Sequence, residues 1–181
     1  MQIRPAEIRD ARALAAIYGH HVLHGFGTFE EVPPTPAEME QRRRAVTDHG
    51  LPYLLAEDAG RVLGFAYAAP FRPRAAYRYT VEDSVYIAPD AIGQGVGRSV
   101  LSAVLDACVG LHLRQVVAVI GDSGNAASIG LHRALGFEPA GVGKSVGFKH
   151  GRWVDIVWMQ KALNGGDAGR PEAPGLALFG H

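Results

Sequence analysis

The chain has 181 residues, of which 48% are hydrophobic and 20% charged, and its 18 basic and 18 acidic side chains leave no formal net charge. This composition predicts one soluble domain and argues against a strongly charged surface that would attract nucleic acid or an anionic membrane. The single cysteine, Cys108, rules out an internal disulfide, and no apolar run has the length of a leader or a membrane span, so a cytoplasmic protein is expected.

Two helices are predicted within the first 50 residues. Asp10 can cap the first helix, which carries an apolar stripe at helical spacing, formed by Leu14, Ile17, Tyr18 and Val22. The segment Thr35-Pro36-Ala37-Glu38 has the spacing of a capping box with proline at the first helical position, and Gly50 can close this second helix. Residues 25–34 between the helices are rich in turn-forming residues and are expected to cover a site.

The next segments predict strands. Residues 53–56 and 62–68 are separated by Glu57-Asp58-Ala59-Gly60, which indicates an antiparallel hairpin. A loop with two arginines and two prolines follows. Residues 79–88 then alternate, with Val81, Val85 and Ile87 on one face and Thr80, Glu82, Ser84 and Tyr86 on the other, until Pro89 ends the strand.

The second half of the chain continues this alternation of helices and strands. A glycine-rich loop opens a helix that ends near Gly110, residues 115–120 form a β-branched run typical of a buried strand, and Asn125 can cap a helix ended by Gly136. Two last strands are predicted near residues 137–142 and 153–160. This order predicts an α/β domain over residues 1–163. The Gly-, Pro- and Ala-rich tail, residues 164–181, is expected to be a mobile extension, with docking of Leu176-Ala177-Leu178-Phe179 as the alternative.

The glycine-rich loop Gly93-Gln94-Gly95-Val96-Gly97 is a candidate anion site. Glycines let the backbone approach a ligand closely, and the helix that follows offers free N–H groups and a positive dipole end, which suit a pyrophosphate. A Walker-type loop requires Gly-Lys-Ser/Thr at its end, but Gly97 is followed by Arg98-Ser99. The spacing also differs from the Rossmann G-x-G-x-x-G pattern.

The loop resembles that of the GNAT superfamily, Gln/Arg-x-x-Gly-x-Gly/Ala. Gly95 and Gly97 match its small positions, whereas Ile92 stands where a polar residue is usual, and Asn125 through Gly136-Phe137 resembles the superfamily's Asn-x-x-Ser/Ala…Gly-Phe element. The resemblance implies a mixed, mostly antiparallel sheet with splayed central strands, flanked by helices, and acetyl-CoA as co-substrate without a metal. It implies cofactor contacts from Val85, Tyr86, Ile87, Gly93, Gln94, Gly95, Val96, Gly97, Arg98, Asn125 and Ser128.

Three further segments resemble the phosphinothricin and methionine sulfoximine acetyltransferases. Residues 66–77 are similar to their Tyr-Ala-x-Pro-Phe-Arg-x-Arg-x-Ala-Tyr block, residues 80–86 to their Thr-Val-Glu-x-Ser/Thr-Val-Tyr strand, and residues 147–155 to their Gly-Phe/Tyr-Lys-x-Gly-x-Trp-x-Asp element. The resemblance implies an N-acetyltransferase that acts on a small amino-acid-like amine, and a homodimer. Its implied substrate residues are Phe29, Arg72, Arg74 and Tyr77.

Acetyl transfer to an amine requires removal of a proton, and Glu82 is the candidate general base. It shares a strand face with Ser84 and Tyr86. An exposed strand glutamate in a salt bridge is the alternative. Asp83 points to the opposite face and is the weaker candidate.

His132 occupies the helical position where many GNAT enzymes carry a tyrosine that protonates the departing thiolate. An imidazole can serve as this acid, but a histidine at the edge of an apolar helix face is an equally good interpretation. The backbone N–H of Tyr86 or Ile87 is expected to contact the developing oxyanion. His20 and His24 stand at i, i+4 spacing, but no carboxylate or thiolate accompanies them in the sequence, which argues against a metal site.

Arg72 and Arg74 stand two residues apart, so in an extended segment both would face the same side and could bind one anionic group. This favours an acidic amino-acid analogue over a polyamine. A GNAT acting on another small amine or on a protein amine remains an alternative, as does a non-catalytic acetyl-CoA-binding module.

Overall fold

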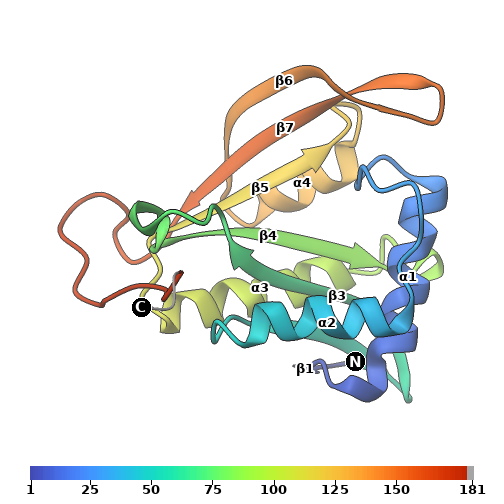
Figure 1. The fold of residues 1–181 in the computed structure, drawn as a ribbon, viewed down its shortest axis with the longest axis horizontal. Helices are drawn as coiled ribbons and strands as arrows, with labels where there is room; N and C mark the ends of the chain where they lie inside the picture. Colours follow the sequence, from blue (N-terminus) through green and yellow to red (C-terminus); the bar gives the residue numbers. More distant parts are fainter. Residues whose placement is uncertain (179–181) are drawn as a thin grey trace.

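The computed structural model describes residues 1–178 and shows a seven-stranded sheet with helices on both faces (Figure 1). The strand order is β1-β2-β3-β4-β5-β7-β6, and the neighbours are antiparallel except β4 and β5. The mixed, mostly antiparallel sheet that the sequence predicted is therefore confirmed. In chain order the elements are β1 (Gln2–Pro5), η1 (Ile8–Asp10), α1 (Ala11–His24), α2 (Pro36–Thr47), β2 (Tyr53–Asp58), β3 (Arg61–Pro70), η2 (Ala75–Tyr77), β4 (Thr80–Ile87), η3 (Pro89–Ala91), α3 (Val96–Gly110), β5 (Gln115–Gly121), α4 (Ala126–Ala134), β6 (Glu138–Lys149) and β7 (Arg152–Ala162).

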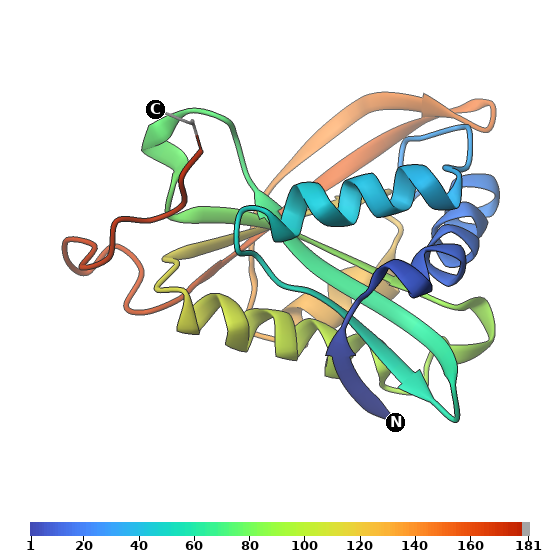
Figure 2. The ribbon, with the colours of Figure 1, turned by 60° about the horizontal axis from the view of Figure 1, so that its bottom comes forward.

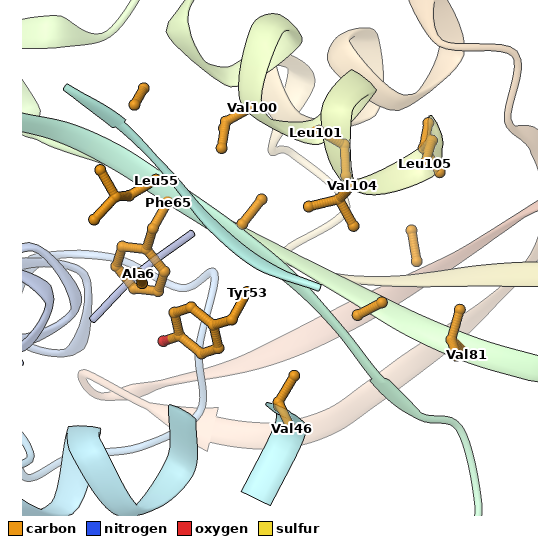
Figure 3. Close-up of a cluster of buried hydrophobic side chains, with 14 of the residues drawn as sticks. Ala6, Val46, Tyr53, Leu55, Phe65, Val81, Val100, Leu101, Val104 and Leu105 are labelled. Carbon is orange, nitrogen blue, oxygen red and sulfur yellow. The ribbon is translucent and has the colours of Figure 1, made fainter. Parts of the chain in front are cut away.

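The core lies on both faces of the sheet. Helices α1 and α2 cover one face and α3 the other (Figure 2). Val100, Leu101 and Val104 of α3 approach the strands from one side, while Tyr53 and Phe65 lie on the other (Figure 3). All five are buried, and removing this apolar surface from water is the main driving force for packing the layers together.

Local signals explain where the helices begin. The Thr35 side chain accepts a hydrogen bond from the Glu38 backbone N–H at 3.2 Å, and the Glu38 carboxylate accepts one from the Thr35 N–H, which confirms the capping box. Asp10 occupies the N-cap position of α1, as the sequence predicted, but its side chain makes no capping hydrogen bond to this helix. Its carboxylate instead accepts two hydrogen bonds from Arg4, at 2.7 and 2.9 Å, which link η1 to β1.

The last hairpin is much longer than the sequence predicted. Strands β6 and β7 are joined at His150 and Gly151, both with positive φ, and they arch away from the rest of the sheet (Figure 1). The pairing register shifts between Gly143 and Gly147, so the period-2 pattern that identifies a strand is interrupted there. This irregularity is why the sequence pattern ended the first strand near Val142.

The central opening of the sheet lies between β4 and β5. These strands pair in parallel only from Thr80 opposite Gln115 to Asp83 opposite Ala118. Beyond this point the carboxyl-terminal ends of both strands, residues 84–87 and 119–121, have no mutual pairing and line the walls of a cleft. The predicted splayed central strands are therefore confirmed.

The described part of the tail lies against the domain. The Leu176 N–H donates to the Arg78 carbonyl at 2.8 Å, and the Tyr79 hydroxyl donates to the Ala173 carbonyl at 2.8 Å. The tail is therefore docked, which was the alternative prediction, and is not the expected mobile extension. The sequence favoured the wrong alternative because these hydrogen bonds use backbone groups, which hydrophobic periodicity cannot reveal. Phe179, part of the predicted docking segment, lies outside the described residues.

Candidate active site

A cleft of about 520 Å³ passes through the opening between β4 and β5. It is lined from the α1 side of the sheet by His21 and by Phe26, in the loop after α1, and from the other side by Val96 of α3 and Leu131 of α4. Because the ends of β4 and β5 do not pair with each other along the cleft, an extended ligand can lie between them. The cleft therefore joins the two faces of the sheet.

The glycine-rich loop forms one end of this cleft. Gly93 and Gly95 have φ values of 79° and 81°, in the left-handed region that favours glycine, and α3 begins directly after Gly95. The space beside both Cα atoms is open. The free N–H groups at the start of α3 thus face an accessible concavity, which is the arrangement that binds phosphate groups.

A second helix start lies at the same cleft. The Asn125 side chain accepts a hydrogen bond from the Ser128 backbone N–H at 3.1 Å, which confirms Asn125 as the N-cap of α4. The cleft is lined by every predicted cofactor residue except Gln94, whose side chain donates to the Asp90 carbonyl at 2.7 Å.

Glu82 lies on the α1 side of β4, directly before the residues of this strand that line the cleft, and is not itself one of the lining residues. Its side chain is 33% exposed, and its Oε2 atom is 4.0 Å from Nη1 of Arg72. Burial raises the pKa of the Glu82 carboxyl above its ordinary value, while the Arg72 charge opposes this shift and the Asp83 charge reinforces it. The result is a carboxylate that accepts a proton more readily than a fully solvated glutamate.

The four predicted substrate residues do not gather in a single pocket. The Arg72 guanidinium lies over the Phe71 ring, with Cζ 4.4 Å from the centroid. Tyr77 lines a shallow groove on the same sheet face as Glu82, together with Phe71, Thr80, Gln115, Val117, Ala140, Trp158 and Gln160. Arg74 is exposed, and β3 ends at Pro70, so the segment with both arginines is not one continuous strand. Phe29 packs directly on Gly147, where an added Cβ atom would be 2.2 Å from the ring.

Asp83 and His132 form a buried pair on the other side of β4. The His132 Nε2 atom is 3.0 Å from Asp83 Oδ2, and the two side chains are 3% and 1% exposed. Nδ1 of His132 is 2.7 Å from the Ser128 carbonyl, an acceptor, so this nitrogen carries a proton. Burial lowers the pKa of His132, but the hydrogen bond and the charge of Asp83 outweigh it and leave the pKa raised above its ordinary value.

The comparisons with known proteins agree with this geometry. Residues 18–137 match the model of the acetyltransferase (GNAT) family. The chain is 58% identical to the phosphinothricin N-acetyltransferase of Alcaligenes faecalis, over 94% of this chain and 86% of that protein. The chain belongs to the GNAT family of acetyltransferases.

Two further matches narrow its place within the GNAT family. The L-methionine sulfoximine/L-methionine sulfone acetyltransferase of Pseudomonas paraeruginosa is 42% identical, over 90% of this chain and 94% of that protein. The crystal structure of a GNAT phosphinothricin acetyltransferase from Sinorhizobium meliloti in complex with AcCoA superposes with a TM-score of 0.91, at 47% identity, and the match covers 94% of this chain and 92% of that one. The predicted resemblance to this group is confirmed.

Sequence reasoning missed several residues of this GNAT site. The sequence indicates Asp83 only as the weaker base candidate, on the face opposite Glu82. Its partner His132 lies 49 residues later, so no local pattern connects the two. Burial lowers the pKa of His21, whose Nε2 atom is 2.8 Å from the Ile87 carbonyl at the mouth of the cleft. The Phe26 carbonyl occupies the space beside Gly121, where a Cβ atom would be 1.9 Å away. A glycine at the end of a β-branched strand is the sequence signal for such a close approach, and it was not used in the prediction.

The loop after α1 is fixed by a buried lysine. Lys149 at the end of β6 is 1% exposed, and its Nζ atom donates to the Thr28 carbonyl at 2.7 Å. Burial lowers the pKa of Lys149, while the charges of Glu30 and Glu31 oppose this shift. This contact connects the β6–β7 hairpin to the loop that covers the cleft.

Among residues 1–178, no group of three His, Cys, Asp or Glu side chains is arranged to hold a metal ion, and His20 and His24 contact each other as rings with centroids 4.7 Å apart. No helix of the described chain is long and apolar enough to cross a membrane.

Proposed function

We propose that this protein is an acetyl-CoA-dependent N-acetyltransferase that acetylates the amino group of a small amino-acid-like substrate of the phosphinothricin, methionine sulfoximine or methionine sulfone type. The observation that carries the proposal is the cleft between β4 and β5, with a carboxylate beside it on one sheet face and a histidine within it from the other. Relatives that share 42% and 58% identity over most of the chain act on these compounds by name. Residues 1–163 form the acetyltransferase domain in this proposal.

The co-substrate is held by backbone groups. Gly93, Gly95 and the first turn of α3 bind the pyrophosphate through N–H groups, and Arg98 adds a positive charge. Residues 85–87 of β4 bind the pantetheine arm along the splayed strand edge, and Asn125 and Ser128 bind it from the α4 side. The lining of the cleft supports this placement.

Glu82 removes the proton from the attacking amine. The amine nitrogen then forms the new bond to the thioester carbonyl carbon, and the backbone N–H of Tyr86 or Ile87 stabilises the charge on the oxygen. The carboxylate is partly exposed on the acceptor side, so the substrate can reach it. Its raised pKa favours the acceptance of a proton from an ammonium group.

His132 acts as the general acid and protonates the leaving group, the CoA thiolate. When the carbon–sulfur bond breaks, its imidazolium gives one N–H proton to the sulfur of the departing thiolate. At rest Nε2–H faces Asp83 and Nδ1–H faces the Ser128 carbonyl, so one of these two hydrogen bonds breaks as the proton is transferred. Asp83 stabilises the charged form of His132 and orients its ring. Burial of both side chains and the 3.0 Å contact between them support this role.

Arg72, Arg74, Tyr77 and Phe29 bind the acceptor in this proposal. The Arg72 guanidinium lies 4.0 Å from Glu82, so an α-amino acid can present its amine to the carboxylate and its anionic or strongly polar head to the arginine. Tyr77 lines the shallow groove on the same sheet face as Glu82, so this groove can hold the rest of the acceptor.

The protein acts as a homodimer in the cytoplasm, with no nucleic-acid or membrane partner. Large apolar side chains gather on the β6–β7 hairpin at 50–63% exposure, namely Val142, Val146, Phe148 and Trp153. A second copy of the chain would cover this surface and remove it from water. Sedimentation at micromolar concentration is expected to show a dimer, and a fully active monomer would contradict this part of the proposal.

The test is a substrate panel with acetyl-CoA and detection of free thiol. Phosphinothricin, methionine sulfoximine and methionine sulfone are expected to release CoA at rates well above those of spermidine and a protein N-terminal peptide. Faster turnover of spermidine, or no thiol release with any amine despite acetyl-CoA binding, would contradict the proposed acceptor class or the enzymatic activity.

A further inference from the structure

The C-terminal segment follows the edge of the domain where β4 and β5 begin. Asn164 donates to the Val109 and Leu113 carbonyls, at 3.0 and 2.9 Å, at the end of α3. Arg114, which precedes β5, donates from Nε to the Gly166 carbonyl at 2.6 Å and from Nη2 to the Gly169 carbonyl at 3.3 Å. The first part of the tail is therefore hydrogen-bonded to the end of α3 and to the connection between α3 and β5.

The second part of the tail reaches a different region. Besides the hydrogen bonds of Leu176 with Arg78 and of Ala173 with Tyr79, the Leu176 side chain packs against the core. Gly175 has a φ of 77°, and a Cβ atom there would lie 2.8 Å from both the Arg78 carbonyl and the Tyr79 ring. Figure 2 shows the last described residues of the tail beside the loop that connects β3 to β4.

This loop, residues 71–79, carries Arg72 and Tyr77. Its residues from 72 to 77 are exposed. Hydrogen bonds join Phe71 to Thr80 across its base and Arg78 to Ala75 within it. A loop with so little buried surface is expected to sample several conformations unless another segment restrains it. The tail restrains it at Arg78, directly after Tyr77.

We propose that residues 170–178 are a brace that holds the loop 71–79 in the conformation that binds the acceptor. The inference rests on the proposed function, because the loop is the acceptor site in that proposal. Tail residues are positioning residues: they act through Arg78 and Tyr79 and make no contact with the reacting atoms. The brace sets the fraction of molecules whose loop is competent to bind, and the apparent affinity for the acceptor scales with this fraction.

Two variants test the brace, and a glycine substitution in the part of the tail before the brace is the control. Gly175→Ala introduces a strained φ and a clash with Arg78, and a chain that stops after Gly169 removes residues 170–181 while keeping the contacts with Arg114. In both, the KM for the acceptor is expected to rise about fivefold, the change produced when the competent fraction falls to about a fifth. The Kd of acetyl-CoA is expected to stay constant, and amide exchange over residues 71–79 is expected to accelerate.

Gly169→Ala is the control, because nothing lies within 4 Å of the added Cβ atom. It is expected to leave KM and exchange unchanged. The brace is wrong if both test variants keep the wild-type KM and the wild-type exchange of the loop, or if acetyl-CoA affinity falls as much as acceptor affinity, which would indicate general stabilisation. A wild-type chain that acetylates none of the proposed amines contradicts the proposed function instead, and faster exchange of the loop in the variants would still support the brace.

Discussion

Glu82 and Asp83 are adjacent carboxylates on β4, yet they lie in different environments. Strand geometry sends them to opposite faces of the sheet. The Glu82 side chain is 33% exposed and lies near Arg72, whereas the Asp83 side chain is 1% exposed and contacts His132. In the proposed function, β4 therefore divides the site into an acceptor half and a thioester half, and the alternation of side chains along the strand gives each half its own titratable group.

The electrostatics of the two halves are complementary. Burial raises the pKa of Glu82, which favours taking a proton, and Asp83 keeps the pKa of His132 above its ordinary value, which favours keeping a proton until the thiolate leaves. A base on one face and an acid on the other suit a reaction that removes a proton from the amine and adds one to the sulfur.

The largest expected effect belongs to the acceptor half. Glu82→Gln preserves the shape of the side chain but removes the base, so kcat is expected to fall by roughly 10²-fold or more. The Kd of acetyl-CoA, measured by calorimetry, should be unchanged. Glu138→Gln, an exposed glutamate at the start of β6, is the matched control and should retain wild-type activity. If Glu82→Gln turns over at the wild-type rate at neutral pH, another group removes the proton from the amine.

The next effect concerns the thioester half. Asp83→Asn removes the charge that raises the pKa of His132, so the imidazolium loses its proton at lower pH. We expect kcat to fall by about tenfold at pH 8, less than the roughly 10²-fold that loss of an acid–base group causes, because His132 itself remains. The alkaline limb of the kcat profile should move to lower pH. His132→Gln should abolish this limb. If Asp83→Asn and wild type have the same alkaline limb, His132 is a structural residue.

A smaller effect is expected at Arg72. Arg72→Lys removes the planar fork that binds an anionic head, and the KM for phosphinothricin is expected to rise about tenfold, comparable to one charge-assisted hydrogen bond. Arg74→Lys tests the second arginine in the same way. Arg72→Gln also removes the charge that lowers the pKa of Glu82, so the acid limb of kcat/KM should move to higher pH. Wild-type KM values in both lysine variants would show that neither arginine binds the acceptor.

Sequence patterns predicted the parts of the site that depend on short-range geometry. The alternation of residues 79–88 placed Glu82 on the face opposite Val81, and the spacing of Thr35 and Glu38 predicted the start of α2. The glycine-rich loop predicted that a helix follows it, and α3 begins at Val96, within the predicted loop, directly after Gly95 with its positive φ.

The remaining parts depend on contacts between distant segments. Asp83 meets His132 from another element, Phe29 meets Gly147 across the β6–β7 hairpin, and the tail meets Arg78 through backbone atoms. Side-chain periodicity carries no information on such contacts. The Gly- and Pro-rich composition of the tail predicted mobility because it contains little apolar surface, but four hydrogen bonds from Arg114, Tyr79 and Leu176 hold it without a large core.

The smallest expected effect is a pH-dependent loss of stability in Asp83→Asn. The pKa of His132 is raised in the folded state, so the Asp83–His132 pair stabilises the fold fully below the ordinary histidine pKa of about 6.5 and loses this contribution as pH rises through the folded-state pKa. Replacing Asp83 should therefore lower Tm more at pH 5.5 than at pH 8.5. A hydrogen bond to a charged group contributes roughly 2 kcal/mol, which corresponds to about 4–8 °C for a domain of this size.

Asp122→Asn separates this effect from the general loss of a buried or paired carboxylate. Asp122 is paired with Arg152, and this guanidinium lowers the pKa of Asp122, so its titration lies below both test conditions. Its Tm difference from wild type should be the same at pH 5.5 and pH 8.5. If the Tm difference of Asp83→Asn is equally flat between the two conditions, His132 does not change its charge in this range, and the acid of the thioester half must be another group.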